Sequence, residues 1–517
     1  MSSSASAKTL RFVLGDQLNV RHSWFGEQDD EVIYVLMETR SETDYTRHHI
    51  QKVLAFFLSM RAFAEALTEQ GHRVHYIKLD DEQNRQSLLE NLVWLADRYK
   101  VNAVEHQQPD EYRLDEVFEE LRARLPVPLR CVDSEHFLTE RDELKNFFEG
   151  KKRYTMEYFY RHMRKRFGIL VDDEGDPEGG AWNFDQDNRN KIPKSIRVPD
   201  PIAFEHEIEP LVAMLAEQGV VTMGSVDAER WEWPITRKEC VIALQDFVKR
   251  RLHLFGTYQD AMTVRDPYLF HARISFALNS KQISPLEVVE AVVTEYRKRE
   301  DEITINQVEG FIRQVIGWRE YMRGIYWAHM PAFAEMNALE HEGELPSWYW
   351  DGNTKMNCLK HAIDQSLELA YAHHIQRLMV TGNFALILGV HPDEVDHWYL
   401  GVYIDAIEWV EITNTRGMSQ FADGGIVGTK PYMSSANYIN KMSDYCKGCH
   451  YDYKLRHGER ACPFNSLYWA FVERHRERLA RNGRIGQMVR IWDRMQADER
   501  EATLAQAEHY MANRHTL

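Results

Sequence analysis

The stretch Leu10-Arg-Phe-Val-Leu-Gly-Asp-Gln-Leu18 begins the pattern that decides the fold. Its apolar run, residues 10–15, is the first of five, and the others lie at 32–38, 73–79, 101–105 and 128–132. Helical stretches at 45–70, 82–99 and 110–125 alternate with them. Because near-continuous apolar strands joined by amphipathic helices form parallel sheets covered on both faces, we expect an α/β domain with a parallel, Rossmann-like sheet over residues 8–135.

Polar residues follow the first two apolar runs, where the ligands of a parallel sheet bind. Gly15-Asp16-Gln17 comes after the first run, and Glu38 and Glu42 come at the end of the second. No GxGxxG sequence follows the first run. The standard dinucleotide-binding fingerprint is therefore absent.

The rest of the chain divides into a connector and a helical part. Residues 136–233 contain a basic helical stretch at 151–166, an acidic Gly- and Pro-containing stretch at 172–180, and Pro193, Pro199 and Pro201. We expect an interdomain connector here, with the basic stretch on the surface. Helical periodicity dominates residues 234–517, for example at 237–254, 285–299, 306–329 and 358–389. We expect a large all-α domain there.

The composition is that of a soluble chain with more than one domain. Its 517 residues exceed what one hydrophobic core supports, and 44% are hydrophobic and 28% charged. No window of about 18 apolar residues predicts a transmembrane helix. The Ser-rich residues 1–8 lack the apolar core of a secretory signal. We therefore expect a cytoplasmic protein with no membrane partner, and we expect a monomer.

The charge is unevenly distributed along the chain. The formal net charge of −17 by itself argues against a nucleic-acid partner. However, residues 145–166 hold eight Lys or Arg and two Glu, and residues 454–494 hold ten Lys or Arg and four acidic residues. An acidic protein with two such basic patches can still bind phosphates, although each patch alone is equally well explained as a solvated helix face.

Three cysteines form the pattern C-x2-C-x12-C-P, at Cys446, Cys449 and Cys462. CKGCH matches covalent haem attachment, but that reaction normally requires export. A zinc site would need a fourth ligand, which His450 or His457 could supply. An iron–sulfur cluster would need a fourth thiolate. The spacing alone leaves iron–sulfur and zinc nearly even.

The other three cysteines differ in what they can supply. Cys131 lies in a predicted strand and Cys240 in a predicted helix, so we expect both to be buried apolar residues. Cys358 begins a long predicted helix and is free to approach the other three. It is therefore the candidate for a fourth thiolate.

The helical part contains two groups of polar motifs. GTYQDAM at 256–262 is followed by HARIS at 271–275, where backbone N–H groups and the Arg273 guanidinium suit a phosphate, although a plain helix cap is the commoner explanation. WREYMR at 318–323 follows. His373, His374 and Arg377 lie in a helical run at 367–379. A His pair there usually serves packing or a metal, and Arg377 disfavours a metal.

These segments together resemble the photolyase/cryptochrome family. ARISxxL followed by SP is similar to its flavin-phosphate loop TSxLSxxL, with His271 and Ala272 in place of Thr and Ser, and Ser275 kept. WRE at 318–320 matches its WRE helix. The chain is most similar to the bacterial iron–sulfur branch, the prokaryotic (6-4) photolyases. That resemblance spans nearly the full chain and is carried by GDQL at 15–18, GTYQDAM at 256–262, FIRQVIGWREYMRGIYW at 311–327, TGNFAL at 381–386, GMSQFADGG at 417–425 and MSDYCKGCHY at 442–451.

The resemblance implies three cofactors: FAD, a 4Fe-4S cluster and a 6,7-dimethyl-8-ribityllumazine antenna. It implies FAD contacts from Tyr258, Arg273, Ile274, Ser275, Leu278, Trp318, Arg319, Arg377 and Asp405. It implies cluster ligation by Cys358, Cys446, Cys449 and Cys462. It implies an antenna pocket with Asp16, Gln17, Met37, Glu38 and Glu42.

The resemblance also implies a reaction, the light-driven splitting of (6-4) photoproducts in UV-damaged DNA. Photoexcited reduced FAD would donate an electron to a flipped-out lesion. His374 matches the proton donor, and Tyr432 and Tyr438 match pocket residues. Trp398, Tyr399 and Trp350 match an electron-transfer chain that reduces the flavin.

Two other functions compete with repair. The first is a cryptochrome-type blue-light photoreceptor with the same fold and cofactors. His374 favours repair, because signalling needs no proton donor for a lesion. The second is a zinc-stabilised nucleic-acid-binding protein without flavin, which would be colourless.

Overall fold

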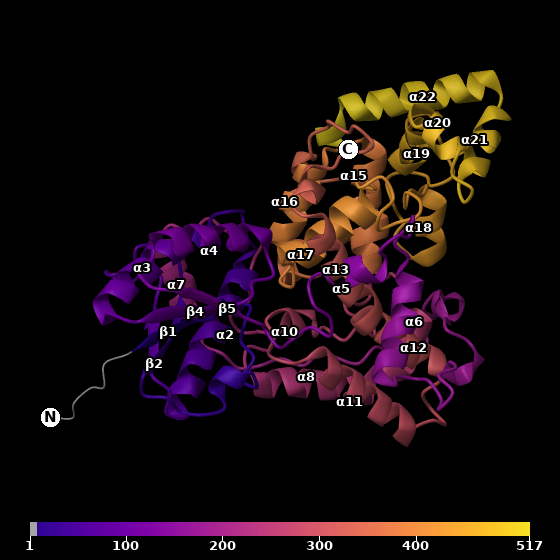
Figure 1. Ribbon diagram of the computed structural model, residues 1–517. Coiled ribbons are helices and arrows are strands. Elements are labelled where there is room, and N and C mark those ends of the chain that lie inside the picture. The colour runs from indigo at the N-terminus through magenta and orange to yellow at the C-terminus, as the bar shows by residue number, and fades with distance from the viewer. Residues whose placement is uncertain (1–7) are drawn as a thin grey trace.

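The computed structural model describes residues 8–517, as an α/β lobe beside a larger helical lobe (Figure 1). The Ser-rich residues 1–7 lie outside the described residues. The α/β lobe contains a five-stranded sheet in the order β3-β2-β1-β4-β5, with every neighbouring pair parallel. The strands are β1 (Thr9–Phe12), β2 (Val32–Met37), β3 (Val74–Ile77), β4 (Ala103–Gln107) and β5 (Leu129–Val132). The predicted parallel sheet is confirmed.

Helices cover both faces of this sheet because its central strands are apolar on both sides. Every residue of β2 is buried. Val32, Tyr34 and Leu36 pack in one core with α2 (Ile50–Glu69). The alternate residues Ile33, Val35 and Met37 pack in a second core with α3 (Leu88–Tyr99) and α4 (Tyr112–Arg124). The alternation of side chains along a strand thus sends neighbouring residues to opposite cores.

The connector packs against both lobes. Its helices are α5 (Glu143–Phe147), α6 (Met156–Phe167) and α7 (Glu209–Glu217). Phe159, Tyr160 and Met163 of α6 are buried in the core of the helical lobe. The basic stretch is therefore exposed on only one face of α6, because its apolar residues recur at helical spacing and face the core. The boundaries after residues 135 and 233 stay a prediction.

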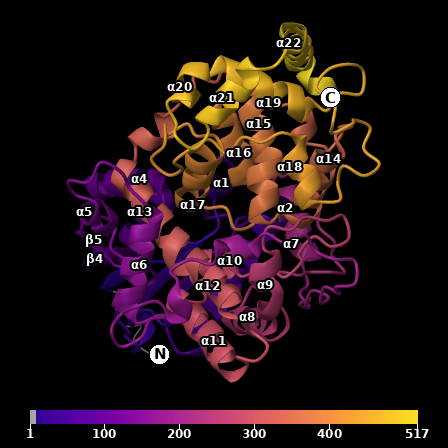
Figure 2. The same ribbon diagram turned by 90° about the vertical axis from the view of Figure 1, so that its right-hand side faces the viewer.

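The helical lobe begins after the connector, and every named strand of the described chain lies outside it. Helices α19–α22 lie at one end of this lobe, and α8 and α11 lie at the other (Figures 1 and 2). No helix among residues 8–517 is both long and apolar enough to cross a membrane. The α-helices of the lobe are α8 (Arg237–Arg250), α9 (Leu252–Tyr258), α10 (Ser275–Asn279), α11 (Pro285–Lys298), α12 (Ile305–Ile312), α13 (Glu320–His329), α14 (Asn357–Leu369), α15 (Asn383–Leu388), α16 (Pro392–Val402), α17 (Glu408–Ile412), α18 (Ala436–Met442), α19 (Pro463–Arg474), α20 (Arg476–Ala480), α21 (Gly486–Asp493) and α22 (Ala497–Ala512).

Two of the predicted long helices are modified. The helix predicted at 306–329 forms, but its middle is a π-helical segment, η4 (Arg313–Arg319). The helix predicted at 358–389 is wrong as one element, because α14 ends where Ala370 adopts a left-handed backbone, φ 52°. Helical backbone resumes at His374 and continues through the π-helical η7 (Gln376–Gly382). A third π-helical segment is η8 (Thr413–Ser419). Such segments are frequent at functional sites.

A buried ion cluster joins the two lobes. Lys281, after α10, places its Nζ 2.8 Å from Asp16 Oδ2 and 2.6 Å from Asp110 Oδ2. The two carboxylates follow β1 and β4 at the carboxyl edge of the sheet. The Lys281 side chain is 1% exposed. Two carboxylates of the α/β lobe therefore hold one cation of the helical lobe.

Replacing Lys281 should destabilise the protein. Lys281→Ala leaves Asp16 without its cation and Asp110 with only the more distant Arg323, at 3.8 Å, which costs about 3–5 kcal/mol for a broken buried pair. Denaturant unfolding monitored by circular dichroism measures the loss. Lys360→Ala is the control, because its exposed pair with Asp364 is worth about 0.5 kcal/mol. Equal losses from the two variants would contradict the assigned role.

Candidate active site

A largely buried ion pair, with the Arg377 side chain 18% and the Asp405 side chain 12% exposed, lies where three segments of the helical lobe meet. Arg377 on η7 places its Nη1 3.0 Å from Asp405 Oδ1, in the loop between α16 and α17. Ser275, at the start of α10, donates its hydroxyl to Asp405 Oδ2 at 2.6 Å. Burial would raise the pKa of Asp405, but the Arg377 guanidinium and the Ser275 hydroxyl outweigh it and hold that pKa below its usual value. Three of the nine predicted FAD residues therefore contact one another.

The loop before α10 contains a second arginine of the predicted set. Arg273 adopts φ 55° and places its guanidinium 3.8 Å from the centre of the Tyr268 ring. Its Nη2 lies 3.1 Å from Glu232 Oε2, while its buried Nε has no hydrogen-bond partner in the described chain. Ile274 and Leu278 are buried beside it. A buried guanidinium N–H without a partner is what a missing anionic or carbonyl group would leave.

The structure places the remaining predicted FAD residues apart from this pair. Arg319 is buried in the interface between the lobes, where its Nη2 lies 3.0 Å from His136 Nε2 and its guanidinium lies 4.6 Å from the Phe137 ring. Trp318 is half-buried and packs edge-on against Tyr321. Tyr258 is half-buried, with its ring 5.9 Å from that of Phe270. Arg319 Nη2 also lies 3.4 Å from the carbonyl oxygen of Leu278, another residue of the predicted set. The FAD contacts of Tyr258, Trp318 and Arg319 stay predictions.

The two adjacent histidines have different surroundings. Part of the His374 side chain is exposed to solvent, although protein surrounds the rest of it. Burial is the larger cause, and the positive charge of Arg377 the smaller, of a pKa lowered to about 4. His373 is buried, and its ring stacks on that of His271 at 4.7 Å and 14°. His373 Nδ1 and His271 Nε2 have no hydrogen-bond partner among residues 8–517. The pair does not lie inside one continuous helix, as the sequence suggested, but where helical backbone resumes.

Aromatic rings surround Trp398, which is fully buried on α16. Its ring centre lies 5.1 Å from Tyr399, 5.2 Å from Tyr349 and 5.9 Å from Tyr403. The Arg377 guanidinium lies 3.7 Å from the Tyr403 ring, so the cluster borders the Arg377–Asp405 pair. Trp350 is 39% exposed and lies near Arg47. It is not among the rings that contact Trp398.

Four thiols line one small cavity of about 320 Å³. Cys358 is in the first turn of α14, Cys446 and Cys449 lie in the loop after α18, and Cys462 immediately precedes α19. Burial raises the pKa of Cys358, and the other three thiols raise it further. The rest of the wall is apolar and aromatic, with Met356, Ala436, Ile439, Tyr445, Tyr451, Tyr453 and Phe464. The four cysteines singled out in the sequence therefore converge.

The other metal-site expectations resolve differently. Cys240 is buried as predicted, but the prediction that Cys131 is buried is wrong, because its side chain faces solvent on β5, an edge strand. His457 pairs with Glu499 at 3.0 Å. No group of three or more His, Cys, Asp or Glu within residues 8–517, the four thiols included, is arranged so that it could hold a metal ion.

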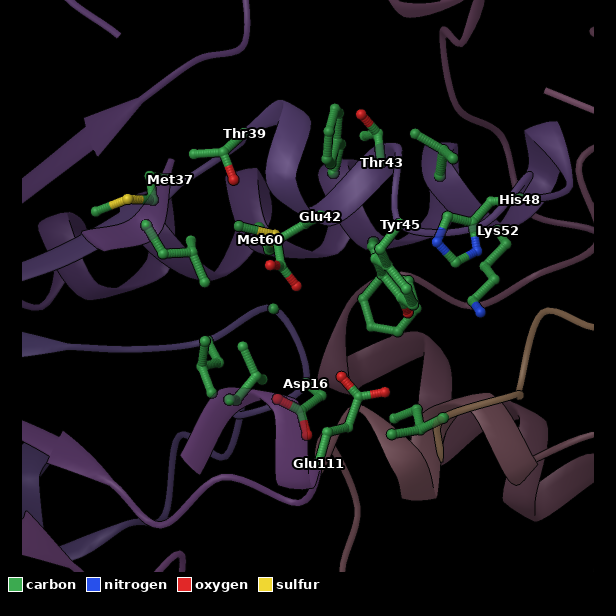
Figure 3. A pocket seen from close by; sticks show the side chains of 18 of the residues that line it. Asp16, Met37, Thr39, Glu42, Thr43, Tyr45, His48, Lys52, Met60 and Glu111 are labelled. Carbon is green, nitrogen blue, oxygen red and sulfur yellow. The ribbon is translucent and has the colours of Figure 1, made fainter. Parts of the chain in front are cut away.

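The carboxyl edge of the sheet borders a larger cavity with about 790 Å³ of empty space (Figure 3). Asp16, Met37 and Glu42 line it, as predicted for an antenna pocket. Figure 3 shows Glu42 on one wall and Asp16 and Glu111 on the wall opposite. Ala406 and Ile407 of the helical lobe complete the lining. The cavity thus has walls from both lobes.

Two predicted antenna residues brace the cavity without lining it. Gln17 accepts a hydrogen bond from Leu14 N and donates to the carbonyl groups of Gln107 and Gln108. Glu38 forms a two-point ion pair with Arg61, at 2.6 and 2.9 Å. The polar groups of both side chains are consumed by these contacts.

The sequence did not single out several polar residues of this cavity. Arg113 is the central one, with its Nη2 2.8 Å from Glu42 and 2.5 Å from Glu111. Its guanidinium lies 3.9 Å from the Tyr45 ring. Glu111 follows β4 at the same sheet edge, so the rule that singled out Asp16 could have found it. Lys52 in α2 and His48 just before α2 also line the cavity. No comparable sequence signal marks either residue.

Tyr432 and Tyr438 form a separate group. Both are half-buried, and both interact electrostatically with Arg189. Burial raises the pKa of Asp260, which lies near Tyr438, to about 6. No hydrogen bond or ring contact within residues 8–517 joins these tyrosines to His374, and their predicted place in one pocket with it stays a prediction.

The buried carboxyl of Glu411 provides a test of this region. Burial raises the pKa of Glu411 from 4.5 to about 8, although Arg377 opposes the shift. Because the folded state binds this proton more tightly than the unfolded chain, the stabilisation is complete below pH 4.5 and is lost as the pH rises through about 8. Glu411→Gln should therefore reduce the fall in unfolding free energy over that range, measured by urea titration. Exposed Glu394→Gln is the control, and a wild-type pH slope in Glu411→Gln would contradict the assignment.

Comparison with known proteins agrees with this arrangement. Residues 11–231 match the family described as deoxyribodipyrimidine photo-lyase-related protein. The chain is 42% identical to the (6-4) photolyase of Agrobacterium fabrum over 504 residues, which covers 97% of this chain and 99% of that protein. Solved structures of a class III photolyase from Agrobacterium tumefaciens (TM-score 0.57, 16% identity, covering 99% of each chain) and of a Synechocystis cryptochrome (TM-score 0.54, 12% identity, covering 97% of this chain and 95% of that one) share the fold. The chain therefore belongs to the photolyase/cryptochrome family, in the branch of the (6-4) photolyases.

Proposed function

We propose that this protein is a light-driven DNA-repair lyase that splits pyrimidine–pyrimidone (6-4) photoproducts with an electron from photoexcited reduced FAD. The observation that carries the proposal is the place of His374. It is a ring with free surface, one helical turn before the buried Arg377–Asp405 pair, in a chain that matches a (6-4) photolyase over nearly its full length.

The residues around Arg377 fit a flavin nucleotide. Arg377, Asp405 and Ser275 offer one polar cluster, and the partnerless N–H of Arg273 offers a donor for a phosphate oxygen. When bound, FAD supplies light absorption and one-electron chemistry. The protein contributes binding, orientation and exclusion of water.

His374 would supply the proton. With a pKa of about 4, its ring is uncharged at neutral pH in the free protein and carries one N–H. Negatively charged DNA bound beside the ring would favour its charged imidazolium form, which can give a proton to a lesion that has gained an electron.

Trp398, Tyr399 and Trp350 would return electrons to the flavin. Trp398 is best placed, because it contacts Tyr399 and lies one ring from Arg377 through Tyr403. Trp350 is the member of the set that reaches solvent. It would exchange electrons with a reductant outside the protein.

The cavity at the sheet edge would hold the lumazine antenna. Its wall combines apolar side chains with charged and hydroxyl groups, which suits a flat polar ring. Asp405 and Ala406 are adjacent in the chain. Asp405 pairs with Arg377, and Ala406 lines the cavity. The antenna and flavin sites would thus share a wall.

The four convergent thiols would hold a 4Fe-4S cluster. Four thiolates around one enclosed cavity is the ligand set of such a cluster.

DNA would lie across the exposed basic residues of α20 and of the loop between α20 and α21. Arg478, Arg481 and Arg484 are exposed, and Arg484 interacts electrostatically with Tyr432. The patch therefore borders the predicted lesion pocket, which favours its use as a phosphate footprint over a plain solvated face. A cytoplasmic monomer stays the prediction.

Replacing His374 should separate repair from flavin binding. His374→Ala should reduce the light-driven conversion of an oligonucleotide with one (6-4) photoproduct by about 10²–10⁴-fold, because it removes the proton donor. Flavin content and photoreduction should remain at wild-type levels. Product analysis by chromatography measures the conversion, and the control is His397→Ala, an exposed histidine on α16.

Other outcomes would identify the alternatives. Flavin photoreduction in the wild type without conversion of any lesion would indicate a blue-light photoreceptor. Conversion of a cyclobutane dimer in place of the (6-4) photoproduct would show that the proposed lesion is wrong. Full activity in His374→Ala would remove the donor role.

Replacing a cluster ligand should remove iron. Cys446→Ser should lower the iron content and the stability, because cluster binding is coupled to folding. Iron is measured colorimetrically in the purified protein. Cys131→Ser is the matched control, since Cys131 is exposed and far in sequence from the thiol cavity. Wild-type iron content in Cys446→Ser would contradict the ligand assignment.

A further inference from the structure

Tyr349 lies between the aromatic cluster and the thiol cavity. It ends a short 3-10 turn, η6 (Ser347–Tyr349), and is completely buried. Its ring contacts Trp398 edge-on at 5.2 Å, and its carbonyl oxygen accepts a hydrogen bond of 2.9 Å from Trp398 Nε1. One residue thus touches the Trp398 indole through both its ring and its backbone.

Tyr349 also interacts electrostatically with one of the four cysteines. Burial raises the pKa of Tyr349, and Tyr403 and then Cys358 raise it further, so its phenol lies within electrostatic reach of both. Tyr403 borders Arg377, and Cys358 lines the thiol cavity. Tyr349 therefore interacts both with the aromatic rings around Trp398 and with one thiol of the cavity.

A second set of ring contacts runs in the same direction. Tyr349 stacks on Trp348 at 4.7 Å and 22°. Trp348 contacts Phe384 at 5.5 Å, and Phe384 contacts Phe464 at 5.1 Å. Phe464 lines the thiol cavity. Packed aromatic rings are thus continuous from Trp398 to the cavity wall.

The hydrogen bonds of Tyr349 decide how it can take part in electron transfer. Its hydroxyl donates to the carbonyl oxygen of Thr381 at 2.7 Å. A peptide carbonyl is too weak a base to take the phenolic proton, so Tyr349 cannot become a neutral radical by losing that proton there. An indole does not need to lose its proton when it is oxidised. Tyr349 is therefore suited to mediate electron transfer without being oxidised itself, whereas Trp398 can exist as an oxidised radical.

We propose that Tyr349 couples Trp398 electronically to the iron cluster that the four thiolates would hold, so that the cluster can refill Trp398 after light. Trp398 gives one electron to the photoexcited flavin and then takes one electron through Tyr349, so the cluster is oxidised by one electron and no proton moves. The inference rests on the proposed function, because it needs bound FAD and iron. It adds an internal electron source to the surface route through Trp350.

Electron paramagnetic resonance of the illuminated, frozen holoenzyme tests this inference. Wild-type protein with oxidised flavin should show a paramagnetic iron signal after blue light that is absent in the dark. Tyr349→Met, which fills the space without a ring, should lose that light-induced signal and should prolong the Trp398 radical seen by transient absorption. Tyr349→Phe should keep both wild-type behaviours, because the ring and not the hydroxyl conducts. Trp350→Phe should keep the iron signal.

Two results would overturn the inference without affecting the proposed function. One is wild-type protein that contains iron and photoreduces its flavin, yet shows no light-induced iron signal, a result that needs no variant to fold. The other is an undiminished signal in Tyr349→Met with wild-type flavin and iron contents. Protein that binds neither flavin nor iron would contradict the proposed function itself.

Discussion

The buried pair between Arg377 and Asp405 is the interaction on which the site depends. Taking a guanidinium and a carboxylate out of water costs several kcal/mol for each ion, so the pair is stable only with good geometry and further hydrogen bonds. Ser275 supplies one such bond to Asp405, and the carbonyl group of Ala372 accepts another from Arg377 Nε at 2.7 Å. Because these groups come from α10, η7 and the loop after α16, the pair fixes three distant segments in one arrangement.

The other sites are arranged around that pair. His374 precedes Arg377 by one helical turn, and the Tyr403 ring stacks on the Arg377 guanidinium. Ala406, the residue after Asp405, lines the cavity at the sheet edge. The ion cluster at Lys281 holds the α/β lobe against the same part of the helical lobe. In the proposed function, light collection, electron transfer and proton transfer are therefore placed by one packed region, and the thiol cavity adjoins it through Tyr349.

Much of this could be predicted from the sequence, because strong periodicity and specific motifs carry it. The apolar runs predicted the sheet, and the cysteine spacing with Cys358 predicted the thiol cavity. The break at Ala370 was missed because a left-handed residue at a helix end has no signal when it is not glycine. Gln17 and Glu38 were assigned to the antenna pocket by the family resemblance and do stand at the expected sheet edge, but a sequence does not show that Arg61 or a backbone carbonyl already occupies their polar groups. Tyr349 was missed for a similar reason, since its role depends on neighbours far away in the chain.

The absorption spectrum of the purified protein, recorded in the dark and after blue light under anaerobic conditions with an added reductant, tests the central claim most directly. If the helical lobe binds FAD that light can reduce, flavin absorption is present in the dark, is lost on illumination and returns with air. A folded protein that shows no flavin absorption, and acquires none on incubation with FAD, would contradict it.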